Sequence, residues 1–232
     1  MGDVKVCGDN PYAFLALIVG QKNVGKSVLV RWICRQYAQD FSYIVVFTPT
    51  ALNGFYQEFL PASHIHDDYD EAVMLKIMEK QTHFREQYEA KVKRGDKDAK
   101  PVRALCIFDD VLGSSTIKLE QRKNNVLNKI WTCNRHWFLS CLVVTQRLTG
   151  VPTSLRQNVD YAFLLRTMLP AHEGIYQAFG HMERRKFEQF LQENTANYKI
   201  IRYTAAVNDP SKHYSVFSIP ESFLKAKFRL QY

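Results

Sequence analysis

The side chains best suited to chemistry lie close to the start of the chain, in a stretch that matches the pattern G-x-x-x-x-G-K-[ST]. The stretch reads Gly20, Gln21, Lys22, Asn23, Val24, Gly25, Lys26 and Ser27. Its glycines let the loop curl so that backbone N–H groups point at phosphate. Lys26 is expected to reach the β- and γ-phosphates of ATP, and the Ser27 hydroxyl to ligate Mg²⁺. With Val28, these residues are the predicted nucleotide-binding set, and ATP and Mg²⁺ are the predicted cofactors.

The segments on either side of this loop fit a strand and a helix. Residues Tyr12–Val19 are apolar throughout and bounded by Pro11 and Gly20, which predicts a buried strand. Residues Ser27–Tyr37 have the spacing of an amphipathic helix, whose positive N-terminal end would face the same phosphates. The alternative is a glycine-containing turn before an ordinary helix, and the flanking elements favour the phosphate loop.

A second group of candidates, Asp109 and Asp110, follows the apolar run Ala104–Phe108. A buried strand that delivers a carboxylate beside a phosphate loop looks like a Walker B element. Asp109 would hold Mg²⁺ through its water shell, and Asp110 would orient or deprotonate the attacking water. The alternative is a strand that ends in an acidic turn, and the phosphate loop upstream makes that interpretation the weaker one.

A third polar strand end is formed by Thr145 and Gln146, after the apolar strand expected at Leu139–Val144. The Gln146 amide is predicted to touch the γ-phosphate or the attacking water and so to report which nucleotide is bound. A strand inserted at this place would put the chain in the additional-strand division of P-loop proteins. The alternative is a strand capped by an ordinary turn residue.

The remaining pattern predicts an α/β fold, with a mostly parallel central sheet flanked by helices. The further strands are expected at Tyr43–Phe47 and Tyr161–Leu165, and a terminal β-hairpin at Tyr198–Tyr203 and Tyr214–Ile219. The further helices are expected at Asp70–Lys93, Leu119–Trp131 and His172–Gln192, the last with a break near Gly180. We expect one domain over residues 1–232, with a core at about 11–166 and the last helices and hairpin at about 170–232.

Composition narrows the class of protein further. The chain has 232 residues, is 46% hydrophobic and carries a formal net charge of +8, which favours polyanionic partners. Its five cysteines include no C-x-x-C pair, and Cys34, Cys106 and Cys141 sit in apolar runs as small buried side chains. We therefore expect a soluble protein of a reducing compartment, and no sequence feature supports membrane anchoring.

Two further patterns, a run of His and Asp residues and a group of aromatic residues, do not indicate a functional site. The run His64-x-His66-Asp67-Asp68 suggests a metal site, but no matching ligands stand elsewhere at a readable spacing, so it is interpreted as a surface turn. The aromatic side chains of Trp131, Trp137 and Phe138 are interpreted as core and not as a platform for bases.

Three ordered motifs and two signatures give the chain a resemblance to a known family. The signatures are Asn134-Arg135-His136 and Leu155-Arg156-Gln157-Asn158, on either side of Thr145-Gln146-Arg147. Over roughly Tyr12 to Leu165 the chain resembles the FtsK–HerA DNA-pumping ATPases. It is most similar to their poxvirus-type branch, the genome-packaging ATPases of large DNA viruses, virophages and related mobile elements.

The resemblance implies an additional-strand, RecA-like P-loop ATPase that acts as a double-stranded DNA translocase. It implies a homo-oligomeric ring, pentamer or hexamer, that moves DNA without reading its sequence and contacts capsid or portal proteins. The expected location is the host cytoplasm, in the viral factory, and the virion. Most additional-strand ATPases carry Glu at the second acidic position, so Asp110 is a less certain base than Asp109 is a metal residue.

Rings of this kind place an arginine of one subunit against the nucleotide of its neighbour, where it stabilises charge on the γ-phosphoryl group. Arg156 is the first candidate, Arg135 the second and Arg147 the third. The alternative for each is a surface arginine or a local ion pair, and for Arg135 that alternative is favoured.

The DNA contacts are harder to assign. A basic cluster, interspersed with acidic residues, surrounds an expected loop, and a solvated loop is favoured over a DNA-gripping one. The cluster consists of Lys91, Lys93, Arg94, Lys97, Lys100 and Arg103.

Two other functions remain open: a nucleotide or small-molecule kinase on a P-loop fold, and a non-motor nucleotide-dependent switch. Arg184 and Arg185 would be the candidates for a kinase lid, but no acceptor site stands out. A GTPase is disfavoured because the chain has no N-K-x-D motif.

Overall fold

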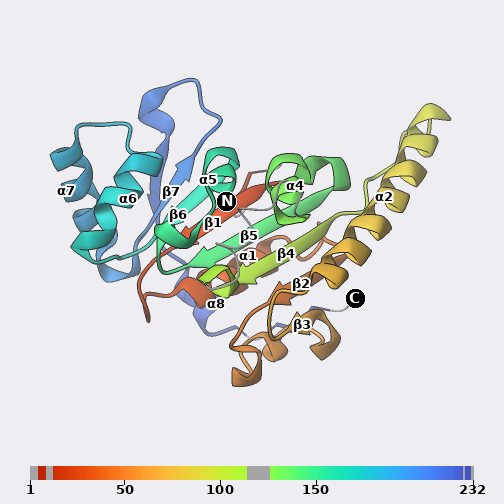
Figure 1. Ribbon diagram of the computed structural model, residues 1–232, viewed down its shortest axis with the longest axis horizontal. Helices are drawn as coiled ribbons and strands as arrows, with labels where there is room; N and C mark the ends of the chain where they lie inside the picture. Colours follow the sequence, from red (N-terminus) through yellow and green to blue (C-terminus); the bar gives the residue numbers. More distant parts are fainter. Residues whose placement is uncertain (1–4, 9–12, 114–125, 227, 231–232) are drawn as a thin grey trace.

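The computed structural model describes residues 5–8, 13–113, 126–226 and 228–230, and within them the strands form one sheet (Figure 1). Its order is β3-β2-β4-β5-β1-β6-β7-β8. The strands are β1 (Leu15–Val19), β2 (Tyr43–Phe47), β3 (Ile65–His66), β4 (Ala104–Asp109), β5 (Leu139–Thr145), β6 (Tyr161–Leu164), β7 (Ile200–Thr204) and β8 (Tyr214–Phe217).

The six strands from β3 to β6 run parallel, and β7 and β8 add an antiparallel hairpin at the β6 edge. The expected α/β class and terminal hairpin are therefore confirmed. Strand β5 lies between β1 and β4, which is the inserted strand that the polar tip at Gln146 predicted. As a result, the carboxyl ends of β1, β5 and β4 lie next to one another at one edge of the sheet.

Helices cover both faces of the sheet. One face packs against α2, α4, α5, α6 and α7, and the other against α1 and α8. The helices are α1 (Lys26–Gln36), α2 (Glu71–Lys93), α4 (Val126–Cys133), α5 (Thr153–Asn158), α6 (Leu169–Phe179), α7 (Arg184–Asn194) and α8 (Glu221–Leu224). The helix predicted at Leu119–Trp131 is seen from Val126 onward, and its earlier residues lie outside the described ones.

The apolar character of the central strands follows from this two-sided cover. In β1, Leu15, Leu17 and Val19 belong to the core cluster on one face, whereas Ala16 and Ile18 belong to the cluster on the other. Side chains of a strand alternate between faces, so a strand buried on both sides must be apolar throughout. The same burial accounts for Cys34, Cys106 and Cys141, which are fully buried as predicted.

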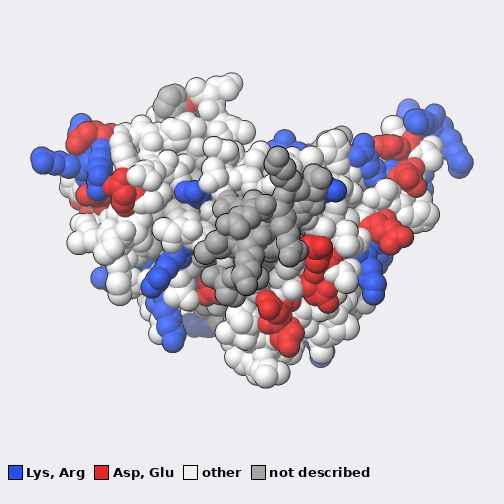
Figure 2. Space-filling model, in the orientation of Figure 1, with Lys and Arg blue, Asp and Glu red and all other residues white. Residues whose placement is uncertain are grey.

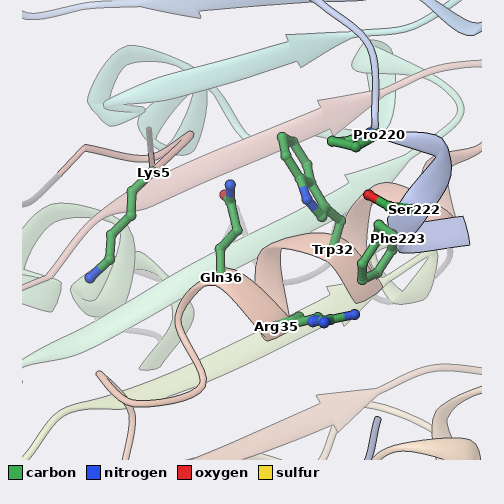
Figure 3. A pocket seen from close by; sticks show the side chains of 7 residues that line it. All are labelled: Lys5, Trp32, Arg35, Gln36, Pro220, Ser222 and Phe223. Carbon is green, nitrogen blue, oxygen red and sulfur yellow. The ribbon is translucent and has the colours of Figure 1, made fainter. Parts of the chain in front are cut away.

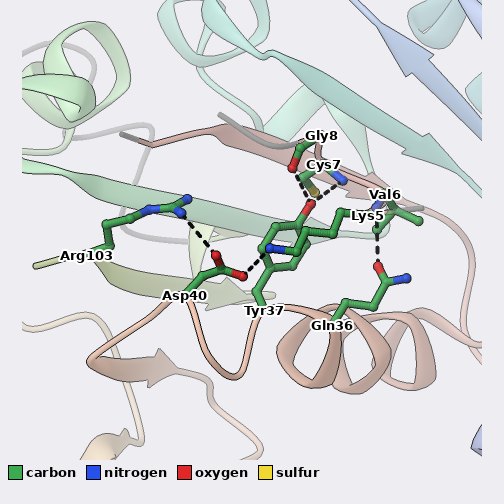
Figure 4. Close-up of polar contacts among 8 residues, drawn as sticks. All are labelled: Lys5, Val6, Cys7, Gly8, Gln36, Tyr37, Asp40 and Arg103. Atoms are coloured by element: carbon green, nitrogen blue, oxygen red, sulfur yellow. Dashed lines mark hydrogen bonds and ion pairs between the residues drawn. The ribbon is translucent and has the colours of Figure 1, made fainter. Parts of the chain in front are cut away.

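A network of polar contacts anchors the C-terminal end of α1 to the segment Lys5–Gly8 (Figure 4). The Tyr37 hydroxyl accepts a hydrogen bond from the Cys7 N–H at 2.8 Å and donates one to the Gly8 carbonyl at 2.9 Å. The Asp40 carboxylate pairs with Lys5 at 2.6 Å and with Arg103 at 3.6 Å. These contacts fix the far end of the helix whose near end begins at the phosphate loop.

Two local features differ from the expectations. The stretch expected as a surface turn contains the edge strand β3, parallel to β2, and the His66 imidazole stacks on Phe47 with ring centres 5.3 Å apart. Two residues are too few to show a strand pattern in the sequence. Strand β7 begins at Ile200 and not at Tyr198, because Asn197 and Tyr198 both have positive φ, which a strand does not permit.

Helix α2 extends past the sheet, and its last turns and the following loop are basic (Figures 1 and 2).

Within the described residues, no helix is both long and apolar enough to cross a membrane. The predicted break in the later helical region is confirmed, since α6 ends at Phe179 and α7 starts at Arg184.

Candidate nucleotide-binding site

The phosphate loop runs from the end of β1 to the start of α1 and is held to the strands beside it. The Gly20 N–H donates to the Thr145 carbonyl at 3.2 Å, and the Gln21 N–H donates to the Arg166 carbonyl at 2.9 Å. At the other end of the loop, Gly25 has φ +96°, in the left-handed region where a residue without Cβ is favoured. The glycine in the G-K-S part of the motif is thus required by the backbone.

The first turn of α1 is open toward this loop. Among the residues that the structure describes, no side chain caps this turn, and the turn contains no acidic residue. The first backbone N–H groups of a helix have no partner within the helix and carry partial positive charge. They are therefore suited to bind an anion from outside the chain, such as a nucleotide phosphate.

Lys26, the first residue of α1, points back into the curl of the loop. Its ammonium group donates to the Gly20 carbonyl at 2.9 Å and to the Gln21 carbonyl at 2.8 Å. Burial lowers the pKa of Lys26, and the nearby carboxylates of Asp110 and Asp109 act in the opposite direction. The ammonium group thus lies among the groups that the sequence assigned to nucleotide and metal binding.

Asp109 ends β4, and its side chain is positioned by a residue that sequence reasoning missed. The Tyr56 hydroxyl donates to Asp109 Oδ2 at 2.7 Å. Burial raises the pKa of Asp109, Asp110 raises it further, and Tyr56 and Lys26 lower it. Tyr56 is fully buried in a 3-10 turn (Tyr56–Glu58), and burial beside Asp109 raises its pKa well above the ordinary value, so it remains a donor.

The predicted metal residues have suitable chemistry for Mg²⁺, which prefers oxygen ligands. Ser27 supplies an exposed hydroxyl in the first turn of α1, and Asp109 supplies a carboxylate two strands away in the sheet. The Tyr56 hydrogen bond engages Oδ2 of this carboxylate. The donor set therefore fits the ion.

Asp110 and Gln146 are brought into direct contact. The Gln146 side-chain amide donates to Asp110 Oδ2 at 2.9 Å. Asp110 has φ +54°, and its N–H donates to the Val144 carbonyl at 3.0 Å, which turns the chain sharply at the strand end. The two residues that the sequence assigned separately to the attacking water thus form one hydrogen-bonded pair.

A pocket of about 510 Å³ opens beside this pair. Gln21 and Lys22 of the loop line it together with Gln146, Arg147 and residues from the start of α6. Arg147 is exposed there. The loop and the tip of β5 therefore share one hollow.

The other two candidate arginines, Arg135 and Arg156, have different surroundings. Arg135 pairs with Asp160 of its own chain at 2.5 Å, which is the local ion pair favoured for it. Arg156 lies on α5 and donates to Thr153 Oγ1 of the same helix at 3.1 Å. It lines a separate pocket with Gln177 and Tyr203. Its Nε is buried without a hydrogen-bond partner among the described residues. Within one chain Arg156 is thus not joined to the Asp110–Gln146 pair.

A further pocket, of about 330 Å³, lies at the opposite end of α1 (Figure 3). Trp32, Arg35 and Gln36 of the last helical turns line it, with Pro220 and Phe223 from the region of α8. Because α1 has 11 residues, this hollow is on the order of 15 Å from the phosphate loop along the helix. It is therefore separate from the site built around Lys26.

Comparison with known proteins connects this chain to viruses with large DNA genomes. It is 26% identical over 186 residues to an uncharacterised protein of Acanthamoeba polyphaga mimivirus, covering 79% of this chain and 64% of the relative. It is 25% identical over 151 residues to an uncharacterised protein of Invertebrate iridescent virus 6, covering 65% and 53% respectively. The chain thus spans between about half and two thirds of the length of these relatives.

Solved structures share the fold. The genome packaging NTPase of Sulfolobus turreted icosahedral virus 2, in complex with ATP-gammaS, matches with TM-score 0.61 and 16% identity over 90% of this chain and 98% of that one. The pCW3 conjugation coupling protein TcpA matches with TM-score 0.60 and 12% identity over 93% of this chain and 65% of that one. A family model described as Poxvirus A32 protein matches residues 10–207. The chain, with its phosphate loop and its inserted strand, belongs to this Poxvirus A32 protein family.

Proposed function

We propose that this chain is the ATP-hydrolysing subunit of a motor that moves double-stranded DNA, in the packaging of a viral genome. The observation that supports this most is the junction at one sheet edge. There the open first turn of α1 lies beside the strand ends that carry Asp109 and the hydrogen-bonded Asp110–Gln146 pair. A phosphate cradle next to a paired carboxylate and amide suits hydrolysis of a nucleoside triphosphate.

The proposed roles follow from these positions. The loop residues 20–28 bind the phosphates, and the Lys26 ammonium leaves the loop carbonyls to meet the γ-phosphate. Ser27 and Asp109 would hold Mg²⁺, which would neutralise phosphate charge. Asp110 orients the attacking water or takes its proton, and Gln146 holds the Asp110 carboxylate in place.

We further propose that the subunits form a ring, pentamer or hexamer, and that Arg156 acts on the nucleotide of the neighbouring subunit. The position of Arg156 away from the Asp110–Gln146 pair of its own chain supports a role in trans. Family membership and the relatives in large DNA viruses support a place in genome packaging. Capsid or portal proteins are then the expected partners, and the host cytoplasm and the virion the expected locations.

Double-stranded DNA is proposed as the polymer that is moved. The net charge of +8 favours a polyanion as the partner. Residues 1–232 are proposed to act as a single domain, in line with the one sheet that joins all the described strands.

The test is ATP turnover measured with and without long double-stranded DNA across a range of salt, with the oligomeric state determined in parallel. DNA is expected to raise turnover of the assembled protein, and Lys26→Ala to lower turnover by about 10²–10³-fold. Lys76→Ala, an exposed lysine on α2, is the matched control and should behave as the unaltered protein. Turnover that ignores DNA, with phosphate transferred to a small acceptor, would replace the motor by a kinase.

A further inference from the structure

Tyr198 is held in an unusual conformation on the surface, next to the phosphate loop. It is 74% exposed, and both it and Asn197 have positive φ, of +58° and +54°. Two successive non-glycine residues in the left-handed region cost conformational free energy, and such strain gathers at functional sites. In the described part of the chain, the Tyr198 side chain makes no hydrogen bond and no aromatic contact. In this backbone conformation the Tyr198 ring lies at the surface, with an aromatic face exposed to solvent.

This face borders a pocket of about 420 Å³ that begins at the phosphate loop. The loop side is formed by Val24, Gly25 and Val28, and the opposite side by Ile219 and Leu224 after the hairpin. A Cβ built on Gly25 would lie 3.8 Å from Cδ1 of Tyr198, so the aromatic ring is close to the loop backbone. The pocket thus continues the phosphate cradle with a largely apolar surface.

The sheet order determines which part of a nucleotide can reach this pocket. The groups that act on the γ-phosphate, Asp110 and Gln146, end strands β4 and β5 on one side of β1. The hairpin β7–β8 and the residues that flank it lie on the other side of β1. A triphosphate in the loop with its γ end toward Gln146 would therefore have its ribose and base nearer to the hairpin side.

We propose that this pocket is the base subsite of the nucleotide site, in which the adenine of ATP stacks on the Tyr198 ring. Val28, Ile219 and Leu224 supply the apolar walls that exclude water from the base. Stacking of a base on an aromatic side chain is an ordinary source of affinity. The inference rests on the proposed ATPase function and names the part of the protein that recognises the base.

The test compares two ligands that share phosphates but differ in the base. Calorimetry measures the affinity of a non-hydrolysable ATP analogue and of inorganic tripolyphosphate for the full chain and its variants. Tyr198→Ala should weaken the analogue roughly tenfold and leave tripolyphosphate unchanged. Tyr198→Phe should retain affinity for the analogue, and Leu52→Ala, at a side chain that is 99% exposed outside the pocket, is the matched control.

Tyr198→Gly guards against an effect through folding. Glycine accepts the left-handed backbone without strain, so this variant should be at least as stable as the unaltered protein while losing the same affinity for the analogue. The inference is overturned if Tyr198→Ala binds the analogue normally, or if it weakens both ligands equally. Failure of the ATPase proposal looks different, because the unaltered protein would then show no ATP hydrolysis, whatever the affinities of the two ligands are.

Discussion

Two helices of this protein begin in opposite ways. At the start of α2, the Asp70 carboxylate accepts hydrogen bonds from the N–H groups of Ala72 at 2.8 Å and Val73 at 3.3 Å, and Glu71 adds negative charge. At the start of α1, a left-handed glycine and a lysine stand where α2 has these acids. One helix carries its own anion, and the other leaves its first turn available to an anion from outside. The difference indicates that the N-terminal end of α1 is suited to bind a ligand.

The largest expected effect is a loss of turnover on removal of Arg156, a positive charge that α1 and its neighbouring strands do not provide. Arg156→Ala should leave ATP affinity nearly intact and lower turnover by about 10³-fold or more, because the γ-phosphoryl charge would lose its partner. The measurement is steady-state ATP hydrolysis alongside nucleotide binding. Mixing this variant with Lys26→Ala subunits should restore part of the turnover in mixed rings. If mixed rings form and turnover stays absent, Arg156 has no role in trans.

The helix comparison itself is tested by paired changes at the two ends. Lys26→Ala should lower turnover by about 10²–10³-fold, since a charge aimed at the phosphates is lost. Asp70→Ala should leave turnover unchanged and lower the free energy of unfolding by about 1 kcal/mol, the usual cost of removing a capping side chain. Denaturant unfolding and ATPase assays on both variants decide the matter. Loss of turnover in Asp70→Ala would contradict the division of roles.

A smaller loss of turnover is expected when the pair at the strand ends is broken. Gln146→Ala removes the 2.9 Å hydrogen bond to Asp110, so the carboxylate is less well aligned, and turnover should fall by up to about 10²-fold. ATP affinity should change little because Gln146 lies outside the loop. Thr149→Ala, at another residue of the same pocket, is the control. Equal turnover in the two variants would remove Gln146 from the proposed mechanism.

The smallest expected effect is a change in stability, and it is an increase. The pKa of Asp109 is raised in the folded protein, so its ionised form disfavours folding at pH values above that pKa. Asp109→Asn removes this penalty and should raise the melting temperature of the nucleotide-free protein at neutral pH, while hydrolysis is lost. The gain should vanish below the ordinary pKa of 3.8, where the carboxyl is protonated in both states. A lower melting temperature at neutral pH would contradict the burial of this charge.

Motifs that are local in the sequence allowed much of the site to be predicted. The loop at Gly20–Ser27, the acids at the end of β4 and the tip of β5 are each marked by residues next to an apolar run. Their convergence follows from parallel strands that end at one edge. The class of the sheet was predicted from apolar strands that alternate with helices, and the inserted strand from the polar tip at Gln146.

Contacts between residues far apart in the sequence could not be predicted in this way. Tyr56 and Asp109 are 53 positions apart, and no periodicity or spacing relates a tyrosine in a short 3-10 turn to a carboxylate at a strand end. Tyr198 was predicted to open the first strand of the hairpin, whereas its φ is positive, which no pattern in the sequence marks. Short edge elements such as β3 were missed because two residues show no pattern.

The backbone at Asp110 also limits how this protein can change over time. Its φ of +54° is tolerated by Asp and Asn better than by other side chains with a Cβ. Glu, the residue usual at this place in additional-strand ATPases, would have to adopt the same left-handed turn at a higher cost in conformational free energy. A single Asp-to-Glu replacement is therefore disfavoured unless the strand end changes its backbone as well. The identity of the acid is set by the shape of the chain as much as by the chemistry it performs.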